Sequence, residues 1–137
     1  MNSESTIRLL VVSEAPEHAE RVASLMRSAG YAVKATRADD AEGLAGVLDA
    51  TPLDVALHVL ADHGIALEDT IGAVRERNLF VPVVAYGAGD PAPGRALAAG
   101  AADRVQEDDE EHLRHVIVRE FERVLTRRRA HHLNEAY

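Results

Sequence analysis

Five short apolar runs alternate with amphipathic stretches along most of this chain, and this alternation limits its fold more than any other feature. The first run, Ile7–Val12, is almost continuously apolar, as is typical of a strand that is buried on both faces of a sheet. The stretches between the runs carry apolar residues at steps of three and four, which predicts helices with one buried face. Five strand–helix units in succession predict a parallel sheet that helices cover on both faces.

The element boundaries follow from apolar periodicity and from the positions of glycine and proline. The predicted strands are residues 7–12, 31–36, 54–60, 81–86 and 103–106. The predicted helices are residues 16–29, 40–49, 67–77, 94–99 and 110 to at least 129. Right-handed crossovers leave few topologies for such a chain, and the strand order 2-1-3-4-5 is the natural one. The sequence therefore predicts an α/β fold of three layers, the flavodoxin-like fold, with a five-stranded parallel sheet and five helices.

Local signals support individual boundaries. Pro16 stands where the first turn of a helix tolerates proline, and Gly30 stands where a helix commonly ends. Either Asp39 or Asp40 is placed to cap the second helix. Residues 87–94 hold three glycines and two prolines, which predicts a loop after the fourth strand.

Composition argues against several classes of function. The chain has 137 residues, which suits one domain, and it has no cysteine, which excludes disulfides, thiolate zinc sites and cysteine nucleophiles. Its net charge of −8 argues against a bulk attraction to nucleic acid. No apolar run approaches the roughly 18 residues of a membrane span, and residues 1–6 lack the features of a signal peptide. We therefore expect a cytoplasmic protein without a nucleic-acid or membrane partner.

Four stretches carry a resemblance to a known family. They are residues 7–16 (IRLLVVSEAP), 52–59 (PLDVALHV), 82–85 (PVVA) and 98–103 (AAGAAD). Over residues 6–127 the chain resembles the receiver domains of response regulators, whose fold is CheY-like. Residues 7–25 are also similar to the N-terminal receiver-like domains of FimX-like cyclic-di-GMP signalling proteins.

The resemblance implies a reaction for which this chain lacks the reacting groups. Receivers move a phosphoryl group from a phosphohistidine onto an aspartate after the third strand, and acidic residues after the first strand hold Mg²⁺. They also use a hydroxyl group after the fourth strand and a lysine after the fifth. The corresponding positions of this chain hold Ser13, Glu14, Val59, Gly87 and Glu107.

The acceptor position has two alternatives, because a slip of one residue in the comparison places His58 there instead of Val59. Neither side chain forms an acyl phosphate, and Glu107 reverses the charge of the lysine. The resemblance therefore implies a degenerate receiver, or pseudo-receiver, that is not an enzyme and needs no cofactor.

Other chemistry at the same end of the sheet stays open. Glu14, Asp62 and Asp90 lie in loops there and are weak candidates for a metal site, against the simpler interpretation that they are solvated acids. A receiver that is phosphorylated at an unconventional acid near Glu14 and a small-ligand sensor are further alternatives. Ser13 has no evident histidine or aspartate partner for a hydrolase triad.

The last predicted helix is longer than one sheet edge requires. From residue 110 to residue 129 it measures about 30 Å, and its apolar stripe stops at Leu125, before three arginines at 127–129. It is either a frayed basic tail or a signalling helix. We expect a receiver-like domain over residues 1–129, and in residues 130–137 the start of a linker or signalling helix to an output domain after Tyr137.

The resemblance also implies a surface for a partner. In ordinary receivers, phosphorylation changes the face that the fourth helix, the fifth strand and the fifth helix form. We expect a protein partner or a homodimer to use this face. The candidate interface residues are Leu97, Arg104, His115, Arg119, Glu122 and Arg123.

Overall fold

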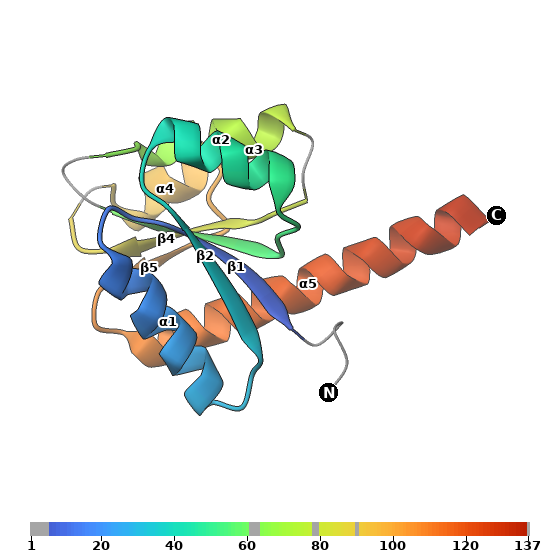
Figure 1. The fold of residues 1–137 in the computed structure, drawn as a ribbon, viewed down its shortest axis with the longest axis horizontal. Helices are drawn as coiled ribbons and strands as arrows, with labels where there is room; N and C mark the ends of the chain where they lie inside the picture. Colours follow the sequence, from blue (N-terminus) through green and yellow to red (C-terminus); the bar gives the residue numbers. More distant parts are fainter. Residues whose placement is uncertain (1–5, 61–63, 78–79, 90, 137) are drawn as a thin grey trace.

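The predicted α/β fold is confirmed by a computed structural model that describes residues 6–60, 64–77, 80–89 and 91–136. Five parallel strands form one sheet in the order β2-β1-β3-β4-β5 (Figure 1). The strands are β1 (Ile7–Val12), β2 (Val33–Ala38), β3 (Val55–Val59), β4 (Val83–Gly87) and β5 (Asp103–Gln106). The helices are α1 (Pro16–Ser28), α2 (Ala41–Ala50), α3 (Leu67–Glu76), α4 (Pro93–Ala99) and α5 (Glu110–Ala136).

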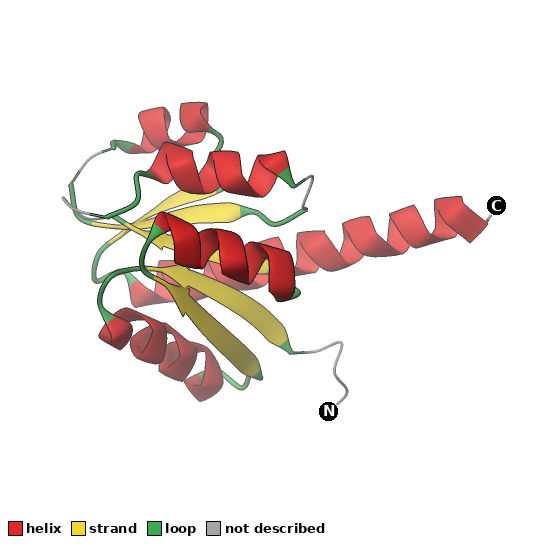
Figure 2. Ribbon diagram, turned by 45° about the horizontal axis from the view of Figure 1, so that its top comes forward, coloured by secondary structure: helices red, strands yellow, loops and turns green. Residues whose placement is uncertain are grey.

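The helices cover both faces of the sheet, which gives the three predicted layers. Helices α1 and α5 lie on one face, and α2, α3 and α4 lie on the other (Figures 1 and 2). Successive side chains of β1 enter opposite cores: Leu9 packs with the α1 and α5 residues, and Leu10 packs with the α2 and α3 residues. This double burial explains why the strand is apolar almost throughout.

Strand β2 is displaced from its predicted position by two residues. It begins at Val33, which pairs with Ile7, and it ends at Ala38, which pairs with Val12. Tyr31 is not part of the strand, because its backbone N–H donates to Met26 O in the turn that ends α1. Gly30 makes this turn with a φ of +94°, a conformation that glycine adopts without steric cost.

The cap of α2 is Asp40, which resolves the choice between two neighbouring aspartates. Its Oδ1 accepts a hydrogen bond from Gly43 N at 2.6 Å. Asp39 is therefore not needed for capping, and it lies at the end of β2 beside the pocket described below.

Helix α5 extends well beyond the sheet. Its buried residues, among them Leu113, Ile117 and Val124, pack on the core. Its 27 residues give a length of about 40 Å, and beyond Arg128 it projects from the rest of the fold (Figure 1). Within the residues that the structure describes, neither α5 nor any other helix is long and apolar enough to span a bilayer.

Candidate functional site

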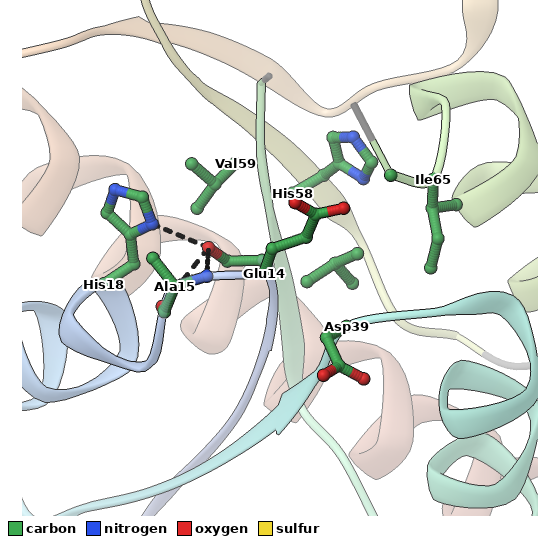
Figure 3. Close-up of a pocket in the computed structure, with 10 residues that line it drawn as sticks. Glu14, Ala15, His18, Asp39, His58, Val59 and Ile65 are labelled. Atoms are coloured by element: carbon green, nitrogen blue, oxygen red, sulfur yellow. Dashed lines mark hydrogen bonds between the residues drawn. The ribbon is translucent and has the colours of Figure 1, made fainter. Parts of the chain in front are cut away.

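A pocket of about 180 Å³ opens at the carboxyl edge of the sheet, beside the ends of β1 and β3 (Figure 3). In a flavodoxin-like fold this edge is where ligands bind. Its lining residues come from the ends of β1 and β3, from the loops that follow β1, β2 and β3, and from the first turn of α1. They are Val12, Ser13, Glu14, Ala15, His18, Asp39, His58, Val59, Gly64 and Ile65. The structure therefore brings together four of the predicted positions, Ser13, Glu14, His58 and Val59.

Ser13 pairs with a histidine, which corrects the expectation that it has no such partner. Its Oγ lies 2.6 Å from Nδ1 of His18, in the first turn of α1 (Figure 3). The same Oγ accepts a hydrogen bond from Ala15 N at 3.1 Å. Ser13 is buried, so its hydroxyl group stabilises the turn between β1 and α1.

Glu14 supplies an exposed carboxylate at the mouth of the pocket. Its Oε1 lies so near Gly64 that a Cβ on that glycine would be only 3.0 Å away. Gly64 also has a φ of +87°, so both space and backbone conformation favour glycine there. Arg37 stabilises the backbone at Ser13 and Glu14, because its Nη1 donates to Ser13 O at 3.1 Å and to Glu14 O at 3.3 Å.

His58 is neutral at pH 7. It is only 2% exposed, and burial lowers its pKa from 6.5 to about 4, although the charge of Glu68 acts in the opposite direction. Its Nδ1 forms a 2.9 Å hydrogen bond with Oγ1 of Thr70 in α3. His58 and His18 stand on opposite sides of the pocket (Figure 3).

Val59 is the other alternative for the acceptor position, and it presents only methyl groups to the pocket. It belongs to the core between the sheet and the α1–α5 layer, whereas His58 bonds to α3 on the opposite face. Both therefore reach the same pocket from different faces of β3. Neither offers a carboxylate, so no acyl phosphate forms at either position.

Gly87 and Glu107 are neighbours of each other but do not line the pocket in the described part of the chain. Glu107 N donates to Gly87 O at 3.3 Å. Leu60 packs against Gly87, since a Cβ there would lie 3.4 Å from Leu60 N, O and Cβ. The Glu107 side chain is exposed, so its charge is solvated rather than directed into the pocket.

The metal candidates are only partly described. Asp62 and Asp90 lie outside the described residues, so the site proposed for Glu14 with these two aspartates stays a prediction. Among the residues with described positions, no group of three or more histidine, aspartate or glutamate side chains is arranged to hold a metal ion.

Sequence reasoning missed two residues of the pocket, His18 and Asp39. A signal for each was present in the sequence. His18 follows Pro16 by two positions, so it lies in the first helical turn, which faces the end of β1. The second helix needs only one cap, so one of Asp39 and Asp40 is left to face the edge of the sheet.

Arg104 is not on the surface, which corrects its place among the interface candidates. It is only 5% exposed, and its guanidinium group donates to three carbonyl groups. The acceptors are Pro91 O at 3.0 Å, Gly89 O at 2.9 Å and Val105 O at 2.6 Å. Arg104 therefore fastens the loop between β4 and α4 to β5 instead of facing a partner.

The other interface candidates are at least partly exposed. Leu97 on α4 is 50% exposed. His115, Arg119 and Glu122 follow one another at steps of four and three, so they share one side of α5, and Arg123 lies beside them.

An ion network joins β5 to α5 on this face. Arg119 donates to Asp103 Oδ2 and to Glu120 Oε2, both at 2.9 Å. Arg123 also donates to Glu120 Oε2, at 3.0 Å. Glu120 is buried, and the two arginines stabilise its charge.

Comparison with known proteins identifies similar structures but no similar sequence family. No protein-family model matches the chain, and no curated protein matches it. The signal receiver domain attributed to the response regulator NarL of Mycobacterium tuberculosis is similar at 24% identity and a TM-score of 0.72, over 86% of this chain and 98% of that one. NtrX from Brucella abortus is similar at 19% identity and a TM-score of 0.75, over 93% of this chain and 29% of that one.

Full-length FixJ from B. japonicum is similar at 18% identity and a TM-score of 0.72, over 85% of this chain and 58% of that one. NtrX and FixJ are therefore longer chains in which this fold is one part. Identities this low establish the fold of the chain, which is the fold of response-regulator receiver domains.

Proposed function

We propose that this chain is a pseudo-receiver, a receiver-fold module of a bacterial signalling protein that works by protein interaction and without phosphoryl transfer. The observation that carries the proposal is the end of β3, where the pocket contains Val59 and a buried, neutral His58. A receiver needs a carboxylate nucleophile at this point, and neither side chain supplies one.

The surroundings of the pocket support the same conclusion. Mg²⁺ is a hard cation that takes oxygen ligands, and Glu14 is the one acidic residue of the β1–α1 loop that lines the pocket. The Ser13 hydroxyl beside it already contacts His18 and Ala15 N. On the β5 side, the position of the receiver lysine holds Glu107, whose solvated side chain supplies no positive charge for a phosphoryl group.

The face of α4, β5 and α5 is the surface that we propose for a partner or for a second copy. Arg104 holds the β4–α4 loop, and the network of Asp103, Arg119, Glu120 and Arg123 joins β5 to α5 without any phosphoryl group. These bonds support a face that is ready for binding rather than one that phosphorylation switches. A symmetric dimer would bury the same patch on both copies.

We also propose that α5 leads to an output domain in a longer cytoplasmic protein. The receiver-like parts of NtrX and FixJ belong to longer chains, which supports this arrangement. The similarity of residues 7–25 to FimX-like proteins makes a cyclic-di-GMP signalling protein one candidate.

Exposure to acetyl phosphate and Mg²⁺, followed by intact-mass measurement, tests the loss of phosphoryl transfer. We expect no phosphoryl adduct, whereas a conventional receiver domain treated in parallel gains one. A stoichiometric adduct would disprove the proposal and favour the alternative of an unconventional acceptor near Glu14. Peptide mapping of the adduct would then identify the acceptor.

The pocket itself favours one second candidate function, that of a small-ligand sensor. Its volume of about 180 Å³ accommodates a small molecule, and Ser13, His18 and His58 place polar groups on its wall. A thermal-shift screen would reveal such a ligand, because a ligand that binds only the folded state raises the Tm. Hits that lose their effect in a Val59→Phe variant, which fills the pocket, would support this candidate.

A further inference from the structure

Three adjoining grooves lie along the amino edge of the sheet, at the end opposite the pocket. The first runs between α3, the start of β4 and α5, and it shares Phe80 and Val81 with the second. The second shares Pro52 and Leu53 with the third, which ends at Lys34 on β2. Together they extend past all five strands, and we call them the amino-edge furrow. Four strand spacings of about 4.8 Å make the furrow about 19 Å long.

The walls of the furrow are basic. Its basic side chains are Arg8, Lys34, Arg75, Arg123, Arg127 and Arg128. Among the described lining residues the only acid is Glu120, whose Oε2 already accepts from Arg119 and Arg123. A chain with a net charge of −8 therefore concentrates positive charge along one edge. Such a patch attracts anionic groups despite the overall charge.

The floor of the furrow is aliphatic. Buried side chains of α3, α5 and the segments that enter β3 and β4 form it. They include Leu53, Ile71, Val74, Val81 and Val124. Phe80 stands between the first two grooves and is 52% exposed. A ligand that fits this surface needs apolar groups as well as negative charge.

Several of the basic groups are held in place. Arg127 lies over the Phe80 ring, 5.5 Å from its centroid. Arg128 donates to Asp54 Oδ1 at 2.6 Å and to Leu53 O at 2.9 Å. The Arg75 guanidinium group lies where a Cβ on Gly100 would stand, so this glycine leaves room for it. Because these side chains are already ordered, a ligand loses less entropy in binding them.

We propose that the amino-edge furrow binds an extended segment of a partner protein that contains both acidic and apolar side chains. An extended chain advances about 3.3 Å per residue, so about six residues span the furrow. In such a chain successive side chains point in opposite directions, so apolar groups reach the floor while carboxylates meet the arginines. Arginine suits this role, because its planar guanidinium group forms two parallel hydrogen bonds with one carboxylate.

Charge alone would also attract single-stranded nucleic acid, but the lining favours a peptide. Proteins that bind single strands stack bases on aromatic side chains. Among the described residues of the furrow, Phe80 is the only aromatic one, and the floor is aliphatic. The furrow also lies at the end of the sheet away from Ser13 and Val59, so this proposal does not depend on the loss of phosphoryl transfer.

Fluorescence anisotropy with a synthetic peptide tests the proposal. The probe is fluorescein-labelled Asp-Leu-Glu-Leu-Asp-Leu-Glu-Leu, and two comparison peptides carry lysine in place of every acid or serine in place of every leucine. We expect the probe to bind, both comparison peptides to bind about tenfold or more weakly, and added NaCl to weaken binding. Failure of the probe to bind, or equal binding of the serine peptide, would overturn the proposal.

Two variants locate the binding surface. Arg75→Gln combined with Arg127→Gln removes two charges from the wall of the first groove, and we expect the Kd of the probe to rise about tenfold or more. Arg21→Gln removes an exposed charge from α1, outside the furrow, and should leave the Kd unchanged. An equal loss in both proteins would indicate attraction to bulk charge and would contradict a defined site.

Oligodeoxythymidylate of matched length is the final competitor. If it binds as tightly as the peptide, nucleic acid would be identified as the ligand instead.

Discussion

The guanidinium group of Arg128 and the carboxylate of Asp54 meet at 2.6 Å, although 74 positions separate them in the sequence. Asp54 is only 2% exposed, and its other oxygen accepts from Arg8 N at 2.8 Å. It lies at the amino edge of the sheet, as expected from its position before β3, and it fastens α5 to the sheet at the point where the helix leaves the fold. The two donors therefore give each oxygen of this buried carboxylate a hydrogen-bond partner.

Arg128→Met should therefore destabilise the fold. The substitution keeps an aliphatic side chain but leaves the buried carboxylate of Asp54 with one donor fewer. We expect the free energy of unfolding to fall by about 1–3 kcal/mol, measured by urea denaturation. Arg129→Met, one position further along the exposed part of α5, is the matched control and should change it by less than about 0.5 kcal/mol. Equal effects of the two substitutions would show that the pair with Asp54 contributes nothing specific.

His58 should make the protein less stable in mild acid. Its pKa is about 4 in the folded protein and 6.5 in the absence of burial, so between these values the unfolded state binds more protons. The contribution is fully present above pH 6.5 and is lost as the pH falls toward 4, up to about 3 kcal/mol. The difference in unfolding free energy between the native protein and His58→Leu, followed from pH 7 to pH 4, measures it.

NMR offers an independent check of the same group. The Cε1–H resonance of His58 should keep its neutral position down to about pH 5. Titration of this ring near pH 6.5 would contradict the burial of His58.

Arg104 should control the order of the loop between β4 and α4. Its three hydrogen bonds go to backbone carbonyl groups of that loop and of β5. Arg104→Met should lower the free energy of unfolding by about 1–3 kcal/mol and speed amide exchange at Ala96, whose N–H donates to Ala92 O at the end of this loop. Arg104→Lys keeps the charge but not the planar group, so it should recover only part of the protection. Unchanged exchange in the methionine variant would show that the loop does not need this side chain.

The two neighbouring aspartates before α2 should differ in their contribution to stability. Asp40→Ala removes the acceptor of the Gly43 N–H and should cost about 1 kcal/mol of unfolding free energy. Asp39→Ala removes only an exposed pair with Arg37 at 3.4 Å, so its effect should be smaller. Thermal unfolding of the two variants side by side measures the difference. A larger loss for Asp39→Ala would mean that the cap is assigned to the wrong residue.

Much of the fold could be predicted from the sequence, because the spacing of apolar residues along the chain shows which side chains are buried. The alternation of apolar runs predicted all five strands and five helices, and β5 occupies the predicted residues, Asp103–Gln106. The displacement of β2 was not predictable in this way. Tyr31 continues the apolar pattern, but the turn after Gly30 uses its N–H and delays the strand to Val33.

The site was predictable only where a residue ends a strand or follows it directly. Ser13, Glu14 and Val59 meet in one pocket because the carboxyl ends of parallel strands share an edge. The partners of Arg104 were not predictable, because two of its three carbonyl acceptors lie 13 and 15 positions away in a loop without periodicity. The amino-edge furrow was missed for a similar reason, since Arg8, Arg75 and Arg128 are far apart in the sequence and come together only through the topology.

Helix α5 also determines an angular relationship. Between Arg128, which is bonded to the sheet, and Ala136 the helix is continuous, so its far end has a fixed rotation about the helix axis relative to the sheet. Each residue inserted into this stretch would turn the far end by about 100° and move it by about 1.5 Å. The orientation of a domain attached there would therefore depend on the number of inserted residues. Seven added residues make almost two full turns and nearly restore the original orientation, whereas three or four change it. The number of residues in this part of α5 therefore determines the direction in which its far end faces relative to the sheet.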